Sequence, residues 1–305
     1  MKTFIVILWL SLAACSAWAG PVGWFAAPAL EQAPDLSLGL DDPAWAKALK
    51  IPFTKLEDAP GDTKKYPTEI YWLKSGGSVF IGFKSVNPAS PKLWVLPNQL
   101  RDSSIYTKES VEIFLGNATG ELFYQFVVDA EGNIFDGKLG SPKWDGDWKC
   151  KTDRREGYWT AVIEIPAPLL ETVWFPGSFV TMDATRHAFN PDGSGAETTS
   201  ITSAGVRSPE NKVFLGSINP AALGKTLERG VADFRENFKS ITLPESIVAR
   251  IPKIEAFAAE CRNAGDVPLD RYLQFYTEFL QKAKEIQQLE QDLVIEIALK
   301  PGRAN

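Results

Sequence analysis

The fold of this chain is decided by two short runs, Thr68-Glu-Ile-Tyr-Trp-Leu-Lys74 and Ser78-Val-Phe-Ile-Gly-Phe-Lys84, which flank the turn Ser75-Gly76-Gly77. Apolar and polar residues alternate in both runs, and this is the period of a strand that buries one face. Glycine provides the backbone freedom that a tight turn between antiparallel strands requires. Residues 68–84 are therefore predicted to form a β-hairpin.

Working outward from the hairpin, the same alternation recurs in short runs separated by turn residues. These runs lie at 111–115, 122–128, 159–165, 179–184 and 212–217. Turn chemistry separates them, as in Asp129-Ala-Glu-Gly-Asn133 and Asn190-Pro-Asp-Gly-Ser-Gly195. Many short strands with few helical patterns between them predict an all-β sandwich that is mostly antiparallel.

After Asn219 the spacing of apolar residues changes from that of strands to that of helices. One predicted helical face carries Ile247, Ile251, Ile254, Ala258 and Cys261, and a second runs from Leu269 through Tyr272, Tyr276, Phe279, Ala283 and Ile286 toward Leu293 and Ile297. A stop at 263–265 and a first-turn proline, Pro268, indicate a helical hairpin within 220–305. Val231, Phe234 and Phe238 mark only a short amphipathic stretch before it, and Pro252 is expected to delay or kink the first helix.

The apolar stripes of this helical segment require a partner. Two interpretations stay open. In the first, which the pattern favours, the helices pack on each other and on the sandwich. In the second, they make the protein a homo-oligomer or bind another partner in the cell envelope.

The first residues predict export. Lys2 precedes an almost wholly apolar run at 4–12, which is typical of a signal peptide and too short to span a membrane. Two processing sites compete, because Leu12-Ala-Ala-Cys15 resembles a lipobox while Ala17-Trp-Ala19 fits ordinary cleavage. The first would make Cys15 a lipid anchor. The expected organisation is a signal peptide at 1–19, a linker at 20–37, a sandwich at 38–219 and the helical segment at 220–305, in a protein of the periplasm, the cell surface or the medium.

Composition narrows the partners. The chain has 305 residues and a formal net charge of −6, without the clusters of Lys and Arg that nucleic-acid binders carry. No later stretch is long and apolar enough to suggest a membrane span. Beyond Cys15 the sequence offers only Cys150 and Cys261, so the chain is not a disulfide scaffold. Two free thiols are favoured over a single bridge, because pair geometry cannot be judged from sequence.

Five motifs follow one another in an order that resembles carbohydrate-binding module family 9. They are Leu40-Asp-Asp-Pro-Ala-Trp45, Ser110-Val-Glu-Ile-Phe-Leu115, Tyr124-Gln-Phe-Val-Val-Asp129 with Gly132, Trp159-Thr-Ala-Val-Ile-Glu-Ile-Pro166 and Phe214-Leu-Gly216. The resemblance covers about residues 38–219. It implies a jelly-roll-like sandwich that holds oligosaccharides or polysaccharides without catalysis.

The resemblance also implies a site. In the family an aromatic residue six positions before a strand glutamate stacks on the sugar and the glutamate binds hydroxyl groups; the matching pair here is Tyr106 and Glu112. On the next strand Gln125 takes the place of a family arginine. Two departures are visible, because Val206 stands near the position of a second stacking aromatic and Glu109 replaces the aspartate that opens the family's strand. The fold is therefore expected to carry over better than the site.

Three further tryptophans, Trp94, Trp144 and Trp148, lie in loop-like contexts and are candidate carbohydrate contacts, although such rings also plug the ends of sandwiches. By contrast, Trp45, Trp72 and Trp159 are predicted to be core residues. The resemblance implies a structural calcium as well, and the oxygen-rich stretches 145–147 and 129–133 could supply its ligands. The alternative for both stretches is that their aspartates simply form turns.

No catalytic constellation is visible. The single histidine, His187, is accompanied by no H-E-x-x-H, G-x-S-x-G or phosphate-loop pattern. A glycosidase needs only two carboxylates about 5 to 10 Å apart, but chance pairs are inevitable among 38 acidic residues. The sequence thus predicts an exported, non-catalytic carbohydrate-binding protein. The alternative is a structural or assembly protein of the cell envelope that acts through its C-terminal helices.

Overall fold

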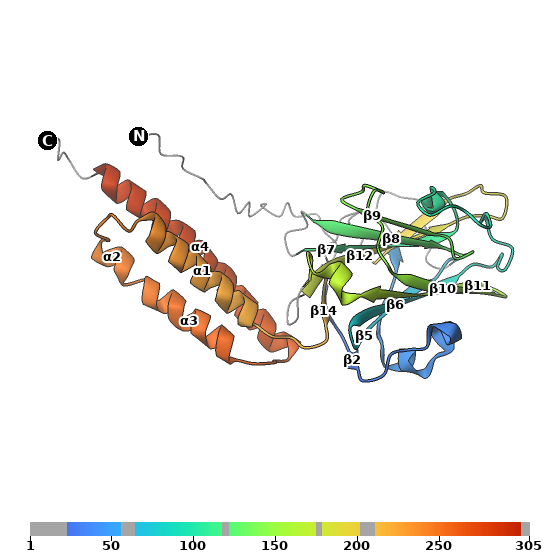
Figure 1. Cartoon of the computed structure of the whole chain (residues 1–305), viewed down its shortest axis with the longest axis horizontal. Helices are drawn as coiled ribbons and strands as arrows, with labels where there is room; N and C mark the ends of the chain where they lie inside the picture. The colour runs from blue at the N-terminus through green and yellow to red at the C-terminus, as the bar shows by residue number, and fades with distance from the viewer. Residues whose placement is uncertain (1–22, 56–64, 118–121, 175–178, 202–210, 300–305) are drawn as a thin grey trace.

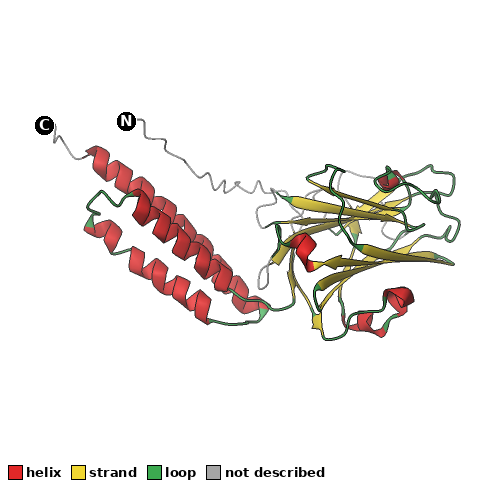
Figure 2. Ribbon diagram, in the orientation of Figure 1, coloured by secondary structure: helices red, strands yellow, loops and turns green. Residues whose placement is uncertain are grey.

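Two stacked β-sheets and a set of C-terminal helices make up the protein (Figure 1). The computed structural model describes residues 23–55, 65–117, 122–174, 179–201 and 211–299. The predicted fold class, an all-β sandwich followed by a helical segment, is confirmed (Figure 2). The predicted signal peptide, Cys15 and Val206 lie outside the described residues.

The first sheet has eight strands. Its main path runs β1 (Trp24–Ala27), β14 (Asn211–Leu215), β12 (Phe179–Ala188), β7 (Ser110–Gly116), β8 (Phe123–Asp129) and β9 (Ile134–Lys138), while β13 (Glu197–Ser200) pairs with β12 and with β4 (Thr54–Lys55). Every pairing is antiparallel except that of β1 with β14, which is parallel.

The second sheet has six strands. Its path runs β10 (Lys149–Arg155), β11 (Tyr158–Pro166), β6 (Ser78–Val86), β5 (Thr68–Ser75) and β2 (Ala29–Leu30), and β3 (Leu49–Pro52) pairs with β5. The hairpin predicted from 68–84 is confirmed as β5 and β6, which pair up to Ser75 and Ser78 at the turn. Short 3-10 helices join the strands: η1 (Leu36–Asp41), η2 (Pro43–Lys47), η3 (Ile105–Thr107) and η4 (Ala167–Leu170).

The core lies between the sheets and follows from the alternation of the strands. On β7 the side chains of Val111, Ile113 and Leu115 are all 0% exposed and belong to one apolar cluster with residues of the second sheet. Each such side chain contributes about 1.5–3 kcal/mol of hydrophobic free energy. The prediction that Trp72 and Trp159 are core residues is confirmed, since both are 0% exposed in this cluster. Trp45 is also buried, at 5% exposure, but in a separate small apolar cluster with Leu73, Phe80 and Val162.

One end of this core holds a buried ion pair. Arg186 on β12 and Glu109, which precedes β7, pair side chain to side chain, and both are 0% exposed. Glu109 also accepts hydrogen bonds from the Trp159 indole N–H at 2.9 Å, the Asn87 amide at 3.0 Å and the backbone N–H of Phe189 at 2.9 Å. The residue that departs from the family's aspartate is thus the acceptor of a polar network that joins the two sheets.

The predicted linker contains two strands. Residues 24–30 form β1, parallel to β14 in the first sheet, and β2, parallel to β5 in the second. These strands are not predictable from sequence, because they are four and two residues long and Trp24-Phe-Ala-Ala27 has no alternation. The chain therefore crosses from one sheet to the other within a few residues.

The helical segment holds three long helices rather than a hairpin. They are α1 (Ala221–Asn237), α3 (Ile251–Asn263) and α4 (Leu269–Leu299), with the short α2 (Glu245–Val248) before α3. The stretch predicted to be short is the 17-residue α1. Pro252 lies in the first turn of α3, where its missing N–H is tolerated, so it begins that helix rather than kinking it. Glycine at 224 lets α1 approach α3 closely, because a Cβ there would lie 2.4 Å from the Ala258 carbonyl oxygen.

The helices extend from one end of the sandwich and share a single apolar cluster with it (Figure 1). At this junction Tyr272 of α4 packs edge-on against Phe214, with ring centroids 4.6 Å apart, and Tyr276 lies 5.0 Å from Trp24. Packing of the helices on each other and on the sandwich, the interpretation that the sequence favoured, is what the structure has. Within the described part of the chain, every helix is too short or too polar to cross a bilayer.

Candidate functional site

Two of the predicted contact residues, Glu112 and Gln125, lie on adjacent strands of the eight-stranded sheet. Because Val111 and Ile113 face the core, Glu112 of β7 faces outward. Gln125 of β8 alternates in the same way with the core residues Tyr124 and Phe126. Both side chains therefore lie on the outer face of this sheet.

A row of hydrogen-bonded side chains runs along this face of the sheet. The Gln125 amide donates to Glu112 Oε2 at 3.3 Å, and His187 Nε2 lies 3.1 Å from Glu112 Oε1. The other ring nitrogen of His187 is 3.3 Å from the Thr198 hydroxyl. Only 3% of Glu112 and 5% of Gln125 are exposed. The carboxylate is thus fixed in place by neutral or weakly basic partners.

Tyr106 lies on the same face, beside this row of side chains. It comes from η3 and packs edge-on against Phe135, with ring centroids 5.8 Å apart. Phe135 of β9 is opposite Val127 of β8, which is in turn opposite Glu112. The half-buried Tyr106 ring and the Glu112 carboxylate are therefore separated by a short apolar shelf.

The tryptophans are placed elsewhere. Trp144 packs on Tyr124 with ring centroids 4.6 Å apart, and Trp148 packs on Phe126 at 5.4 Å. Trp148 is 5% exposed and offers no open face, so it plugs the core rather than facing solvent. Trp94 lies at the start of β7, where its carbonyl oxygen accepts the Glu109 N–H at 3.0 Å. The structure thus places Tyr106 and the Glu112 pair on one face, while Trp144 and Trp148 pack on core rings and the Trp94 ring lies 5.2 Å from the Lys108 ammonium.

Both oxygen-rich stretches have internal partners. Asp129 accepts hydrogen bonds from the backbone N–H groups of residues 131 and 133 and from the Asn133 amide, and burial raises its pKa. This is the turn-forming role. Asp145 lies near Asp102 and Asp136, with their oxygens within 4.8 Å of one another. Arg101 forms ion pairs with Asp136 at 2.7 Å and with Asp145 at 3.2 Å. Its positive charge therefore already offsets part of the negative charge of these carboxylates.

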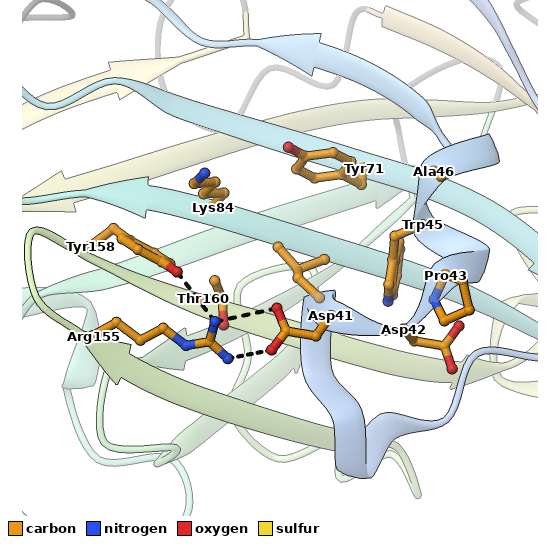
Figure 3. A pocket seen from close by; sticks show the side chains of 11 residues that line it. Asp41, Asp42, Pro43, Trp45, Ala46, Tyr71, Lys84, Arg155, Tyr158 and Thr160 are labelled. Carbon is orange, nitrogen blue, oxygen red and sulfur yellow. Dashed lines mark hydrogen bonds and ion pairs between the residues drawn. The ribbon is translucent and has the colours of Figure 1, made fainter.

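A concavity that sequence reasoning missed lies on the outer face of the other sheet (Figure 3). It has a volume of about 390 Å³ and is bounded by η1, η2 and strands β5, β6, β10 and β11. Tyr71, Tyr158, Lys84 and Arg155 line it. The signal in the sequence that could have found it is the pattern of polar and aromatic residues at the outward positions of these strands, none of which belongs to the candidate contacts predicted above.

Comparison with known proteins bears on the fold. No family model and no curated protein matches the chain. Among solved structures, a "putative carbohydrate-binding protein" from Bacteroides uniformis is similar with a TM-score of 0.50 and 12% identity, over 63% of this chain and 98% of that one. The class that the fold defines is therefore a β-sandwich shared with that protein.

Two more structures are similar. They are those of a carbohydrate binding module family 9 from Caldicellulosiruptor kristjanssonii, in complex with glucose and with cellotriose. Their TM-scores are 0.45 and 0.44 at 13% identity; each covers 63% of this chain, and 95% and 93% of the respective neighbour. Both bear the name of the family that the sequence motifs resemble.

Proposed function

We propose that the protein is an exported, non-catalytic glycan-binding protein whose site is the Tyr106 face of the eight-stranded sheet. The observation that carries the proposal is the juxtaposition of a half-buried tyrosine ring with a hydrogen-bonded carboxylate on one face. An aromatic ring packs against the apolar C–H face of a pyranose, while carboxylates and amides bond its hydroxyl groups. Tyr106 supplies the first element and Glu112 with Gln125 the second.

The burial of Glu112 sets the strength of this site. A sugar hydroxyl that reaches the carboxylate has to compete with Gln125 and His187 for its oxygens. The ring next to the Phe135 and Val127 side chains on this face is that of Tyr106. Binding is therefore expected to be weak, and to gain from several sugar units lying along the shelf.

The non-catalytic part of the proposal rests on the sequence, which shows no H-E-x-x-H, G-x-S-x-G or phosphate-loop pattern. In addition, both oxygens of Glu112 already have partners, the Gln125 amide and the His187 ring. We therefore expect that incubation with polysaccharides releases no new reducing ends.

Titration calorimetry with a panel of oligosaccharides tests the proposal. Tyr106→Ala removes the stacking ring and is expected to weaken binding about fivefold, corresponding to about 1 kcal/mol. Tyr106→Phe keeps the ring and serves as the matched control, with affinity close to that of the wild type. Glu112→Gln keeps the shape of the side chain but removes its charge, and should weaken binding further. Equal affinities in Tyr106→Ala and the wild type would reject this face as the site.

Export is the second part of the proposal, and the apolar run after Lys2 supports it. Mass spectrometry of the protein isolated from its native cells distinguishes the two processing sites. A lipidated Cys15 at the N-terminus indicates a membrane-anchored protein, whereas an N-terminus at Gly20 indicates ordinary secretion. An unprocessed chain would reject export.

An assembly role is favoured by a separate observation at the end of α4. Val294, Ile295 and Ile297 are 56%, 54% and 44% exposed within about one turn of the helix. We propose this apolar end as the surface for self-association if the chain acts in assembly. Light scattering of the wild type and of Val294→Lys decides: a monomeric wild type rejects the role, and an oligomer that the substitution dissociates supports it.

A further inference from the structure

We propose that the concavity on the six-stranded sheet is a second, independent binding site for a neutral sugar, facing away from the Tyr106 face. This inference rests on the proposed function only for the class of ligand. The site itself is argued from the side chains that line the concavity (Figure 3).

The concavity has a defined floor and walls. Tyr71 of β5, Lys84 of β6 and Thr160 of β11 come from three adjacent strands, and Lys84 is directly opposite Thr160 in the register. One wall is formed by η1 and η2 through Asp41 and Trp45. The volume of about 390 Å³ lies in the range of about 300–1,000 Å³ typical of small-molecule sites.

A glycine sets the position of that wall. At Gly82 of β6 an added Cβ would lie 2.6 Å from Leu40 and 3.2 Å from the Trp45 ring. Because glycine leaves this space free, η1 and η2 lie directly on the sheet beside the concavity. The wall is further fixed by the Trp45 indole N–H, which donates to the Gly39 carbonyl oxygen at 3.0 Å.

The far edge is held by an ion pair that crosses from β10 to η1. Arg155 binds Asp41 through two nitrogens, at 3.2 Å and 2.5 Å, and its Nε donates to Asp153 at 2.8 Å. It also donates to the Tyr158 hydroxyl at 3.3 Å. The hydrogen bond from Arg155 lowers the pKa of Asp41, so the pair stays ionised at neutral pH.

The charges of the lining favour a neutral ligand. Two acids, Asp41 and Asp42, face two bases, Lys84 and Arg155. Arg155 is committed to its carboxylates, and Asp42 accepts the backbone N–H of Ala44 and of Asp35. The lining therefore has no net charge that would select an anion or a cation.

The remaining groups suit a polyhydroxylated ring. Tyr71 and Tyr158 are half-buried aromatics whose rings can pack on C–H groups. Between them the exposed Lys84 ammonium lies 5.0 Å above the Tyr158 ring. Its long side chain lets a sugar take that place while the ammonium donates to a hydroxyl oxygen. Rings and donors on a rigid sheet are what a pyranose requires.

Fluorine NMR of the full chain labelled with 3-fluorotyrosine tests this inference, because the seven tyrosines include residues on each of the two faces, in the sandwich core and on α4. Tyr71 and Tyr158 report on the concavity, Tyr106 reports on the other face, and the buried Tyr124 reports on global changes. Single Tyr→Phe variants assign the signals. The probes are the neutral trisaccharides cellotriose, xylotriose and maltotriose, with inorganic phosphate and glucuronic acid as charged controls.

A neutral trisaccharide is expected to shift the Tyr71 and Tyr158 signals saturably, in Tyr106→Ala as well as in the wild type. Tyr158→Ala should weaken the response at Tyr71 at least tenfold, while Tyr158→Phe, which keeps the ring, should change it little. Thermal unfolding of each variant confirms that it is folded.

The outcomes separate the two sites. If only the Tyr106 signal moves, the second site is rejected and the proposed function stands. If only Tyr71 and Tyr158 move, the second site stands and the Tyr106 face is rejected. A response to the charged probes alone rejects the neutral class of ligand, and signals that none of the probes moves reject both sites.

Discussion

The sandwich and the helical bundle bury different kinds of side chain. The sandwich encloses Glu109 and Arg186 at 0% exposure, whereas the buried side chains of the described helices are apolar apart from the Tyr272 hydroxyl and the Cys261 thiol. Strands that slip by two residues keep their apolar faces inward, so alternation alone does not select one register. A buried ion pair does select one register, because its two side chains must meet. The helices are aligned instead by the fit of their surfaces, as where Gly224 of α1 lies against α3.

Two spectroscopic probes follow the regions separately. All ten tryptophans precede residue 175, so tryptophan fluorescence reports on the sandwich and its junction. Far-UV circular dichroism is dominated by the helices. The free energy of unfolding of each variant is measured with both probes during urea unfolding.

The largest effect is expected from Glu109→Ala, which should lower the free energy of unfolding by about 3–5 kcal/mol, because Arg186 is left buried without its carboxylate. The loss should appear in the fluorescence transition. Glu156→Ala, which removes an exposed carboxylate from the β10–β11 turn, is the control and should change the free energy by less than about 0.5 kcal/mol. A fluorescence midpoint equal to that of the wild type would contradict the structural role of the pair.

Leu289→Ala tests the bundle. Leu289 of α4 is 0% exposed, and the cavity left by its removal should cost about 2–5 kcal/mol. The circular dichroism transition should move further than the fluorescence transition. Leu280→Ala on the same helix is the matched control, since Leu280 is 42% exposed. Equal effects of the two substitutions would show that this face of α4 is not packed.

A smaller effect is expected at the junction. Tyr276→Ala removes the ring that packs on Trp24, and aromatic pairs contribute about 0.5–1.5 kcal/mol beyond their buried area. A double-mutant cycle with Trp24→Ala measures this coupling. Tyr276→Ala should also separate the circular dichroism transition from the fluorescence transition, because the bundle loses part of its contact with the sandwich. Additivity of the two substitutions would mean that the rings do not interact.

The smallest effect concerns reactivity rather than folding. Each region contains one free thiol, Cys150 in the sandwich and Cys261 in the bundle. Burial raises their pKa values to about 11 and about 12. At pH of about 8 the thiolate is then about a thousandth and about a ten-thousandth of each population, so alkylation should be slow and should accelerate as pH rises.

The thiols also sharpen the comparison. Glu109→Ala should accelerate alkylation at Cys150 more than at Cys261, and Leu289→Ala should do the reverse, as read by peptide mass spectrometry. Rapid labelling of both the half-buried Cys150 and the buried Cys261 in the native wild type would contradict these raised pKa values.

The sandwich was predictable because its long strands alternate clearly. The hairpin at 68–84 and the run at 111–115 each show their buried face in the sequence. The edge strands β1 and β2 were not predictable, because they are short and are held by pairing with distant strands. In the bundle, α1 was underestimated because Gly224 and Gly230 interrupt its pattern where neighbouring helices come close.

The candidate sites divide in the same way. The spacing of Tyr106 and Glu112 was available from the sequence, and the shared face of Glu112 and Gln125 follows from strand period. Their hydrogen bonds to each other and to His187 depend on strand pairing across the sheet. The concavity on the six-stranded sheet was not predicted, because η1, η2 and four strands from separate parts of the chain contribute to it.

The parallel pairing of β1 with β14 has a mechanical consequence. If the protein is held by its N-terminus while load is applied through its helices, β1 and β14 are pulled in opposite directions along their common axis. Their ladder bonds then carry the force together rather than opening one after another. Strands loaded in this way resist separation. In a protein tethered at its N-terminus, the helices would therefore unfold under load before β1 separated from β14.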